Sequence, residues 1–188
     1  MVSAGAALLA WRAARHSAEA SRSLSTVEAR RWHADLTPQF RVTWRAVSDL
    51  RAELRVELVG PSALDRLDEL SIEVRDDIAG RAPVIAGGAT QEQITAQIWG
   101  PYHFVPGIDG ADATGRRTAP IALLLGEWRP FALQRTMAPP WSSNHGDGGA
   151  WWIDEHDGHP VRLTLRCRRH GDDPWAVPIE VATTMLGR

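Results

Sequence analysis

The stretch from Val161 to Val181 constrains the fold more than any other part of the sequence, because it predicts two β-strands joined by a tight turn. Apolar and polar side chains alternate in both strands, and the apolar ones are Val161, Leu163, Leu165, Cys167, Trp175, Val177, Ile179 and Val181. A period of two places these groups on one face of a pleated strand. Between the two runs lies HGDDP, which has the composition of a turn. The pattern predicts an antiparallel sheet with one buried face and one face in water.

The same alternation recurs earlier in the chain. It predicts a hairpin within residues 39–59, a strand ending near residue 74, a strand within residues 93–99, and one or two strands within residues 121–135. The side chains predicted to face inward are Phe40, Val42, Trp44, Leu54, Val56, Leu58, Leu70, Ile72, Val74, Ile94, Ala96, Ile98, Trp128, Phe131 and Leu133. Pro130 implies a sheet edge or a bulge. About seven or eight short strands separated by turn signals favour a mainly β fold, an antiparallel β-sandwich of the immunoglobulin-like or C2-like kind.

The N-terminal segment has a different composition. It is rich in Ala, Ser and Arg, and these residues predict one α-helix from about Ala4 to Ala34. Pro38 then disfavours helical geometry at Thr37. The sequence therefore predicts a helix within residues 1–36 and a β-sandwich domain over residues 37–188. Apolar residues are sparse on this helix, so we expect it to act as a tether or to pair with a second copy of the chain.

The apolar run at the N-terminus is too short to cross a bilayer. It ends before Arg12, whereas a spanning helix needs about 20 apolar residues. The charges follow this run instead of preceding it, which disfavours a signal peptide. Contact of residues 1–15 with a membrane surface is still compatible with the pattern. The single cysteine, Cys167, cannot form an internal disulfide, and its inward position predicts a core residue and not a nucleophile. We therefore expect a cytoplasmic protein with a membrane surface as a further contact.

The charge balance excludes one broad class of partner. The 188 residues carry a net charge of -2 with a pI of about 6.4, so the basic excess typical of nucleic-acid binders is absent. All 21 basic residues are arginine, a bias that fits either GC-rich codon usage or selection for bidentate contacts to anions.

The densest polar cluster, NHGDGGAWWIDEHDGHP, immediately precedes the strand at Val161. Its histidines, His145, His156 and His159, are candidate ligands of zinc or another divalent metal. The alternative is a solvated loop. Acidic pairs in other predicted loops, Asp76–Asp77, Asp109–Asp112 and Asp172–Asp173, offer a calcium site if they meet at one end of the sandwich. The chain has no phosphate-binding loop and no Gly-x-Ser-x-Gly motif, and we predict no cofactor.

The chain contains nine tryptophans beside one tyrosine. Packing accounts for most of them, because each indole buries a large area. Trp141, Trp151 and Trp152 flank the glycine-rich loop and are candidates for an exposed stacking surface that binds a carbohydrate-like ligand. Such a site would require the loop from Trp141 to His159 to lie beside the loop from Gly107 to Arg117.

Four stretches carry a resemblance to known proteins: LLAWRAARHSAEAS, ARRWHADLTPQFRVTW, WGPYHFVPGIDGADATGR and LGEWRPFALQRT. Their order resembles that of a group of uncharacterised actinobacterial proteins with an N-terminal hydrophobic segment, an Ala/Ser/Arg-rich helix and a Trp-rich β domain. The resemblance covers nearly the whole chain. It implies membrane attachment and a cytoplasmic β domain, and it implies no activity and no site residues.

Three functions are compatible with these observations. The first is a non-enzymatic domain that binds an unidentified protein partner or acts as a scaffold, displayed on the N-terminal helix. The second is a ligand-binding module that uses the loop tryptophans. The third is a metal-dependent hydrolase that uses the loop histidines. The sequence favours the first, because it contains no recognisable pair of a catalytic base and its positioning partner.

Overall fold

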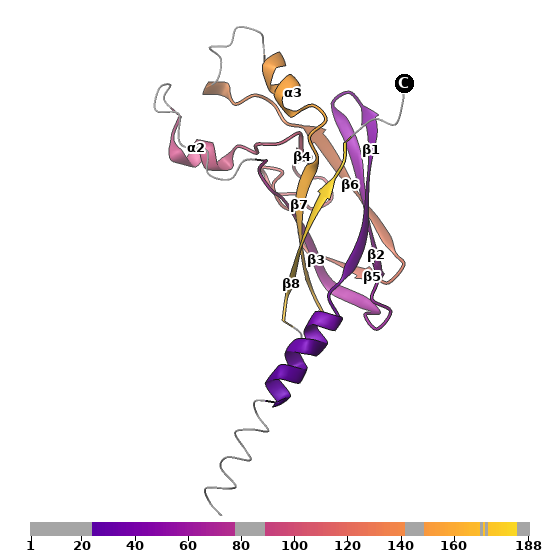
Figure 1. Ribbon diagram of the computed structural model, residues 1–188. Helices are drawn as coiled ribbons and strands as arrows, with labels where there is room; N and C mark the ends of the chain where they lie inside the picture. The colour runs from indigo at the N-terminus through magenta and orange to yellow at the C-terminus, as the bar shows by residue number, and fades with distance from the viewer. Residues whose placement is uncertain (1–23, 78–88, 142–148, 170, 172, 184–188) are drawn as a thin grey trace, which may run out of the picture. The chain divides into compact units, whose positions relative to one another are not determined.

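The computed structural model describes residues 24–77, 89–141, 149–169, 171 and 173–183. The β domain is an antiparallel β-sandwich of two four-stranded sheets, as predicted (Figure 1). The first sheet has the spatial order β1 (Gln39–Ser48), β2 (Arg51–Gly60), β6 (Trp128–Arg135) and β4 (Tyr102–Phe104). The second has the order β5 (Ile121–Leu124), β3 (Arg66–Val74), β7 (Val161–Arg168) and β8 (Trp175–Val181).

The hairpin of β7 and β8 forms as the alternating pattern predicts. Leu163 pairs with Ile179 and Leu165 with Val177, in an antiparallel register without a bulge. The inward side chains of β7 are all buried. Cys167 is among them, and burial raises the pKa of its thiol to about 12. The prediction that Cys167 is a core residue is confirmed, because a buried thiol of this pKa stays protonated and unreactive.

The hairpin of β1 and β2 is also confirmed, with Val42 opposite Val56. The inward side chains of β2 are fully buried, whereas those of β1 are only half-buried. The difference follows from position, because β1 is an edge strand and β2 lies between two neighbours.

The prediction for β6 is correct in part. Phe131 and Leu133 face the core, but Trp128 lies on the outer face, where the guanidinium carbon of Arg55 sits 4.5 Å from the ring centroid. Trp128 is an odd number of positions from Phe131, and this spacing places the two rings on opposite faces. Pro130 pairs only with β2, beyond the end of β4, so it occupies a local edge as predicted.

The strand predicted within residues 93–99 is wrong. The first part of this segment belongs instead to a short helix, α2 (Gln91–Ala96). Thr90 caps it: the Gln93 amide donates to the Thr90 hydroxyl at 3.2 Å, and the Gln93 side chain accepts from the Thr90 amide at 2.8 Å. This reciprocal capping box satisfies two amides that an extended chain would leave to other partners.

The N-terminal helix is described over residues 24–35, and the rest of its predicted span, residues 4–23, lies outside the described residues. The chain divides into two compact units, Met1–Thr37 and Pro38–Arg188. Among the described residues, no helix combines the length and the apolar character that crossing a membrane requires.

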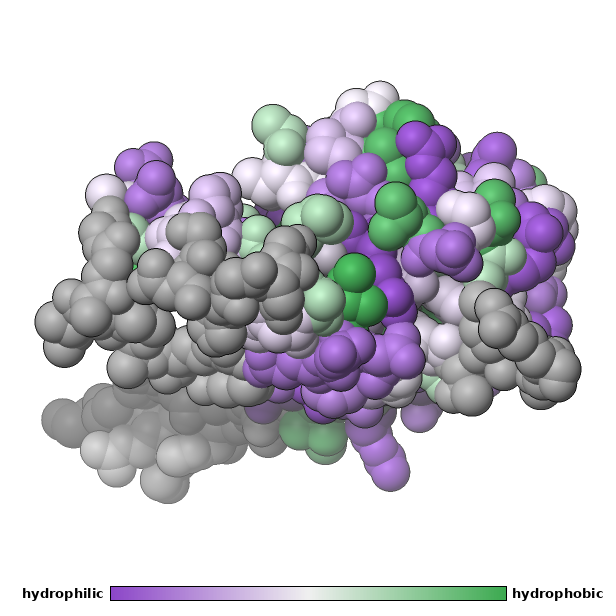
Figure 2. All heavy atoms as spheres, turned by 90° about the horizontal axis from the view of Figure 1, so that it is seen from above, coloured by the Kyte–Doolittle hydropathy of each residue, from purple (hydrophilic) through white to green (hydrophobic). Residues whose placement is uncertain are grey.

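Arginine–carboxylate pairs line the outer faces of both sheets. In the first sheet, Arg41 donates to Glu57 at 2.8 Å; in the second, Glu73 accepts from Arg166 at 3.0 Å and from Arg117 at 2.9 Å. Each exposed pair contributes at most about 1 kcal/mol. The surface combines hydrophilic and apolar residues, and the apolar ones form separate patches (Figure 2).

Candidate functional site

Three residues from distant parts of the chain meet at one end of the sandwich. Asp77 follows the end of β3, His156 is the last residue of α3 (Ala150–His156), and His159 lies just before β7. Each offers one ligand atom, and these atoms all lie within 4.8 Å of one another. Within the part of the chain that the structure describes, no other cluster offers three potential ligands at this spacing.

The turn after α3 sets the two imidazoles side by side. The His159 amide donates to the His156 carbonyl at 3.2 Å, and Gly158 between them has a φ of 71°. The rings are nearly parallel, with an interplanar angle of 12° and centroids 6.0 Å apart. This geometry depends on Gly158, because a residue with a Cβ adopts a left-handed conformation only at a cost.

His156 is the least satisfied polar residue of the site. His156 is only 4% exposed, and neither of its ring nitrogens has a hydrogen-bond partner. Burial lowers the pKa of His156 below the ordinary value of an imidazole, against the opposing charges of Glu155 and Asp77. The ring is therefore neutral near pH 7 and keeps one lone pair. A buried polar group without a partner is rare in native proteins, so His156 is a candidate metal ligand.

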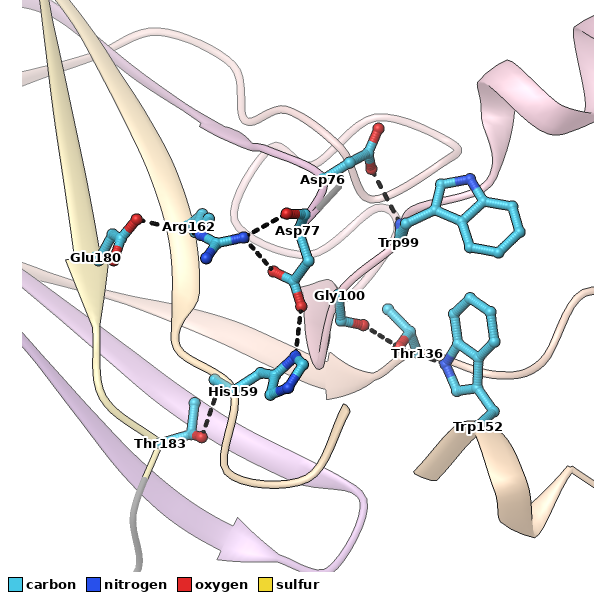
Figure 3. Close-up of polar contacts among 10 residues, drawn as sticks. All are labelled: Asp76, Asp77, Trp99, Gly100, Thr136, Trp152, His159, Arg162, Glu180 and Thr183. Carbon is cyan, nitrogen blue, oxygen red and sulfur yellow. Dashed lines mark hydrogen bonds and ion pairs between the residues drawn. The ribbon is translucent and has the colours of Figure 1, made fainter. Parts of the chain in front are cut away.

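Asp77 connects His159 to an arginine. The Asp77 side chain is 7% exposed, and its Oδ2 lies 3.0 Å from Nδ1 of His159 (Figure 3). Arg162 Nη1 lies 3.5 Å from Oδ1 of Asp77 and donates to the Asp77 carbonyl oxygen at 2.5 Å. The other side of this guanidinium, Nε, donates to Glu180 of β8 at 3.1 Å. Arg162 therefore contacts both the backbone and the carboxylate of Asp77, on the side away from His159.

The position of α3 depends on Trp152. This residue is 1% exposed, and its ring centroid lies 4.4 Å from that of His156 and 5.2 Å from that of Trp99. Its Nε1 donates to the Thr136 hydroxyl at 2.9 Å, and that hydroxyl donates in turn to the Gly100 carbonyl (Figure 3). A helix of seven residues is not stable by itself, and Gly149 provides no side-chain cap. Packing of Trp152 therefore keeps His156 in place.

A binding site at this end would require the loop from Gly107 to Arg117 to lie beside the loop from Trp141 to His159, and the described residues of both contact the segment 95–100. Arg116 Nη2 donates to the carbonyl oxygens of Thr95 and Gln97, at 3.3 and 2.8 Å, while Trp152 packs on Trp99 from the other loop. An open cavity of about 280 Å³ lies beside this segment and is lined by residues that include Gln97, His103, Thr114, Thr136, Met137 and Pro140. Figure 1 shows α2 and α3 at this end.

Two of the three predicted metal ligands, His156 and His159, lie together, and His145 lies outside the described residues. The sequence named the third member of the cluster, Asp77, only as a candidate calcium ligand. The segment around His156 was expected to be irregular, and its helix α3 corrects that expectation.

Trp152 cannot belong to the stacking surface that the sequence predicted from three tryptophans. Trp152 is buried and offers no face to a ligand, whereas Trp141 and Trp151 are half-buried. Trp151 instead meets Trp152 edge-on, with ring centroids 5.5 Å apart.

Protein donors already occupy three of the candidate calcium ligands, Asp76, Asp109 and Asp112. Asp109 accepts from the Ala132 amide at 2.7 Å, and Asp76 accepts from the Trp99 amide at 3.0 Å. Burial alone would raise the pKa of Asp112, but hydrogen bonds from Thr114 and from the following backbone lower it. These carboxylates stabilise turns, and Asp172 lies outside the described residues.

Comparison with protein-family models, with curated proteins and with solved structures finds no match to this chain.

Proposed function

We propose that the β domain binds one divalent transition-metal ion through Asp77, His156 and His159. The observation that carries this proposal is the buried His156, whose two ring nitrogens lack partners although it faces two further ligand groups. Two imidazoles and one carboxylate suit zinc, iron or cobalt better than calcium or magnesium, which prefer oxygen ligands. Three protein ligands leave a coordination position open, as in catalytic centres.

The spacing of the ligand atoms supports this proposal. Tetrahedral zinc with bonds of about 2.0–2.1 Å places its ligand atoms about 3.4 Å apart. The three groups here lie within 4.8 Å, so small side-chain rotations suffice. His159 has the freedom to rotate, because its side chain is 51% exposed.

Metal binding is the first test. After removal of metal with a chelator, the full chain should bind zinc with a stoichiometry of one by isothermal titration calorimetry. His156→Ala should weaken binding by at least about 100-fold, because it removes the buried ligand. Zinc at 100 times its Kd should also stabilise the protein by about 2.7 kcal/mol.

His33→Ala is the matched control, because His33 lies on the N-terminal helix and outside the cluster. It should leave the affinity unchanged. Absence of stoichiometric binding, or equal binding by the His156→Ala protein, would contradict the proposal.

A second candidate function concerns the N-terminal helix. We propose that the β domain is displayed on this helix, which tethers it to a protein partner, to a membrane surface or to a second copy of the chain. The division into two compact units supports this organisation. So do Leu24, Val27 and Trp32, which are all exposed on the described part of the helix. Exposed apolar side chains of this size support contact with a partner.

Deletion of residues 1–36 should leave a folded domain. The truncated chain should unfold cooperatively on heating, because every strand of the sandwich lies after this segment. Light scattering should show a larger particle for the full chain than for the truncated one if the helix pairs with a second copy. Loss of cooperative unfolding would contradict the two-part organisation.

A further inference from the structure

A conspicuous feature beside the candidate metal centre is Arg162, an arginine shared between two carboxylates. It contacts the buried Asp77 on one side and Glu180 on the edge strand β8 on the other. The Glu180 side chain is more than half exposed, so water weakens its pairing with the arginine. Nη2 of Arg162 makes no hydrogen bond to a described residue and is available to a ligand.

The charges around the centre do not cancel once an ion is bound. A divalent ion brings two positive charges, and Asp77 removes one of them. Arg162 and Glu180 offset each other. The ion and its three ligands therefore keep one positive charge, which Glu155 near His156 reduces without binding the ion, and the exposed His159 places this charge near solvent. In a partly buried site, such a charge attracts an anion more strongly than it would in water.

We propose that the metal-loaded centre binds a compact oxyanion, either a carboxylate or a phosphate group, with Arg162 as the second contact of that anion. This inference rests on the proposed metal site. One oxygen of the anion fills the open coordination position, and another accepts a hydrogen bond from the guanidinium, whose fork of donors matches both groups. The ligand class of the centre is therefore a small acid or a phosphate ester.

The experiment has two stages, so that each proposal can fail separately. Cobalt is first titrated into the chelator-treated full chain in a buffer that does not coordinate metals. Failure to bind one equivalent overturns the metal site itself. Acetate and inorganic phosphate are then added separately to the cobalt-loaded protein, and perchlorate controls for ionic strength. The visible cobalt spectrum should change with saturation for acetate or for phosphate, and the responding anion identifies the class.

Two substitutions should act in opposite directions. Arg162→Gln should weaken anion binding about tenfold, because the charged hydrogen bond is lost. It should change cobalt affinity by less than this factor, since the lost hydrogen bonds to Asp77 are opposed by removal of a positive charge beside that ligand. Glu180→Gln should strengthen anion binding about threefold, because Arg162 loses its competitor. Arg162→Lys keeps the charge and should retain most of the affinity.

Glu57→Gln is the control, because Glu57 forms the same kind of surface pair in the other sheet. It should change neither affinity. The inference is overturned if neither anion alters the spectrum of a protein that has bound cobalt. It is also overturned if Glu180→Gln leaves anion affinity unchanged, or if Arg162→Gln weakens metal and anion binding equally, as a purely structural arginine would.

Discussion

Replacing Gly115 with alanine should destabilise the β domain by about 3 kcal/mol or more, because strain in the left-handed region adds to a steric clash. Gly115 has a φ of 70°, and a Cβ there would lie 2.2 Å from the Phe104 carbonyl oxygen and 2.3 Å from Nδ1 of His103. Neither neighbour can easily move. Phe104 is paired with Leu133 of β6 and donates its amide to the Gly115 carbonyl at 2.9 Å.

Gly107→Ala separates the two effects. Gly107 has a similar φ of 75°, but nothing lies within 4 Å of the added Cβ. Its cost should be about 1–2 kcal/mol, the price of the backbone conformation alone. Urea unfolding of both variants measures the difference. Equal destabilisation would show that the loop carrying Gly115 relaxes around the new methyl group.

The second large effect is expected at Trp152. Trp152→Ala should cost about 3–5 kcal/mol, the range for removing a large buried aromatic side chain. The substitution empties the space between Trp99 and His156 and leaves Thr136 without one hydrogen-bond donor. Trp152→Phe should cost less, since it keeps a ring in place and removes mainly the hydrogen bond.

Trp128→Ala is the matched control for Trp152, because Trp128 is 48% exposed and stacks on Arg55 at the surface. It should cost about 1 kcal/mol or less. Thermal and urea unfolding provide the comparison, and metal titration provides an independent readout. Because Trp152 holds α3, its replacement by alanine should also weaken metal binding. A similar stability loss at both tryptophans would argue that α3 is not anchored by Trp152.

The strands that the sequence predicts correctly are those whose two faces differ sharply. In β7, buried Leu163 and Leu165 flank Thr164, so local pattern and tertiary burial agree. In residues 93–99 the alternation of Ile94 and Ile98 is misleading, because the capping interaction of Thr90 with Gln93 selects a helix. Trp128 was misassigned because an aromatic residue was expected to be buried, although its spacing from Phe131 already indicated the opposite face.

Of the three residues of the candidate site, the sequence brings only His156 and His159 together. His156 and His159 lie three residues apart in one polar segment, which identifies them as a possible pair. Asp77 is 82 positions from His159 in the chain and comes close only when β3 pairs with β7. No local sequence pattern predicts that β3 pairs with β7. The role of Arg162 cannot be predicted from the sequence either. It occupies an ordinary outward position on β7, and only its contact with Asp77 distinguishes it from the other outward residues of that strand.

The contact between Trp152 and His156 gives the candidate site an optical signal of its own. With ring centroids 4.4 Å apart, the excited indole is close enough for an ion or a proton on the imidazole to change its emission. Trp99 lies against the same indole and extends the effect to a second chromophore. We therefore expect metal binding at the proposed centre to change the intrinsic fluorescence, so that titration would follow it without a label.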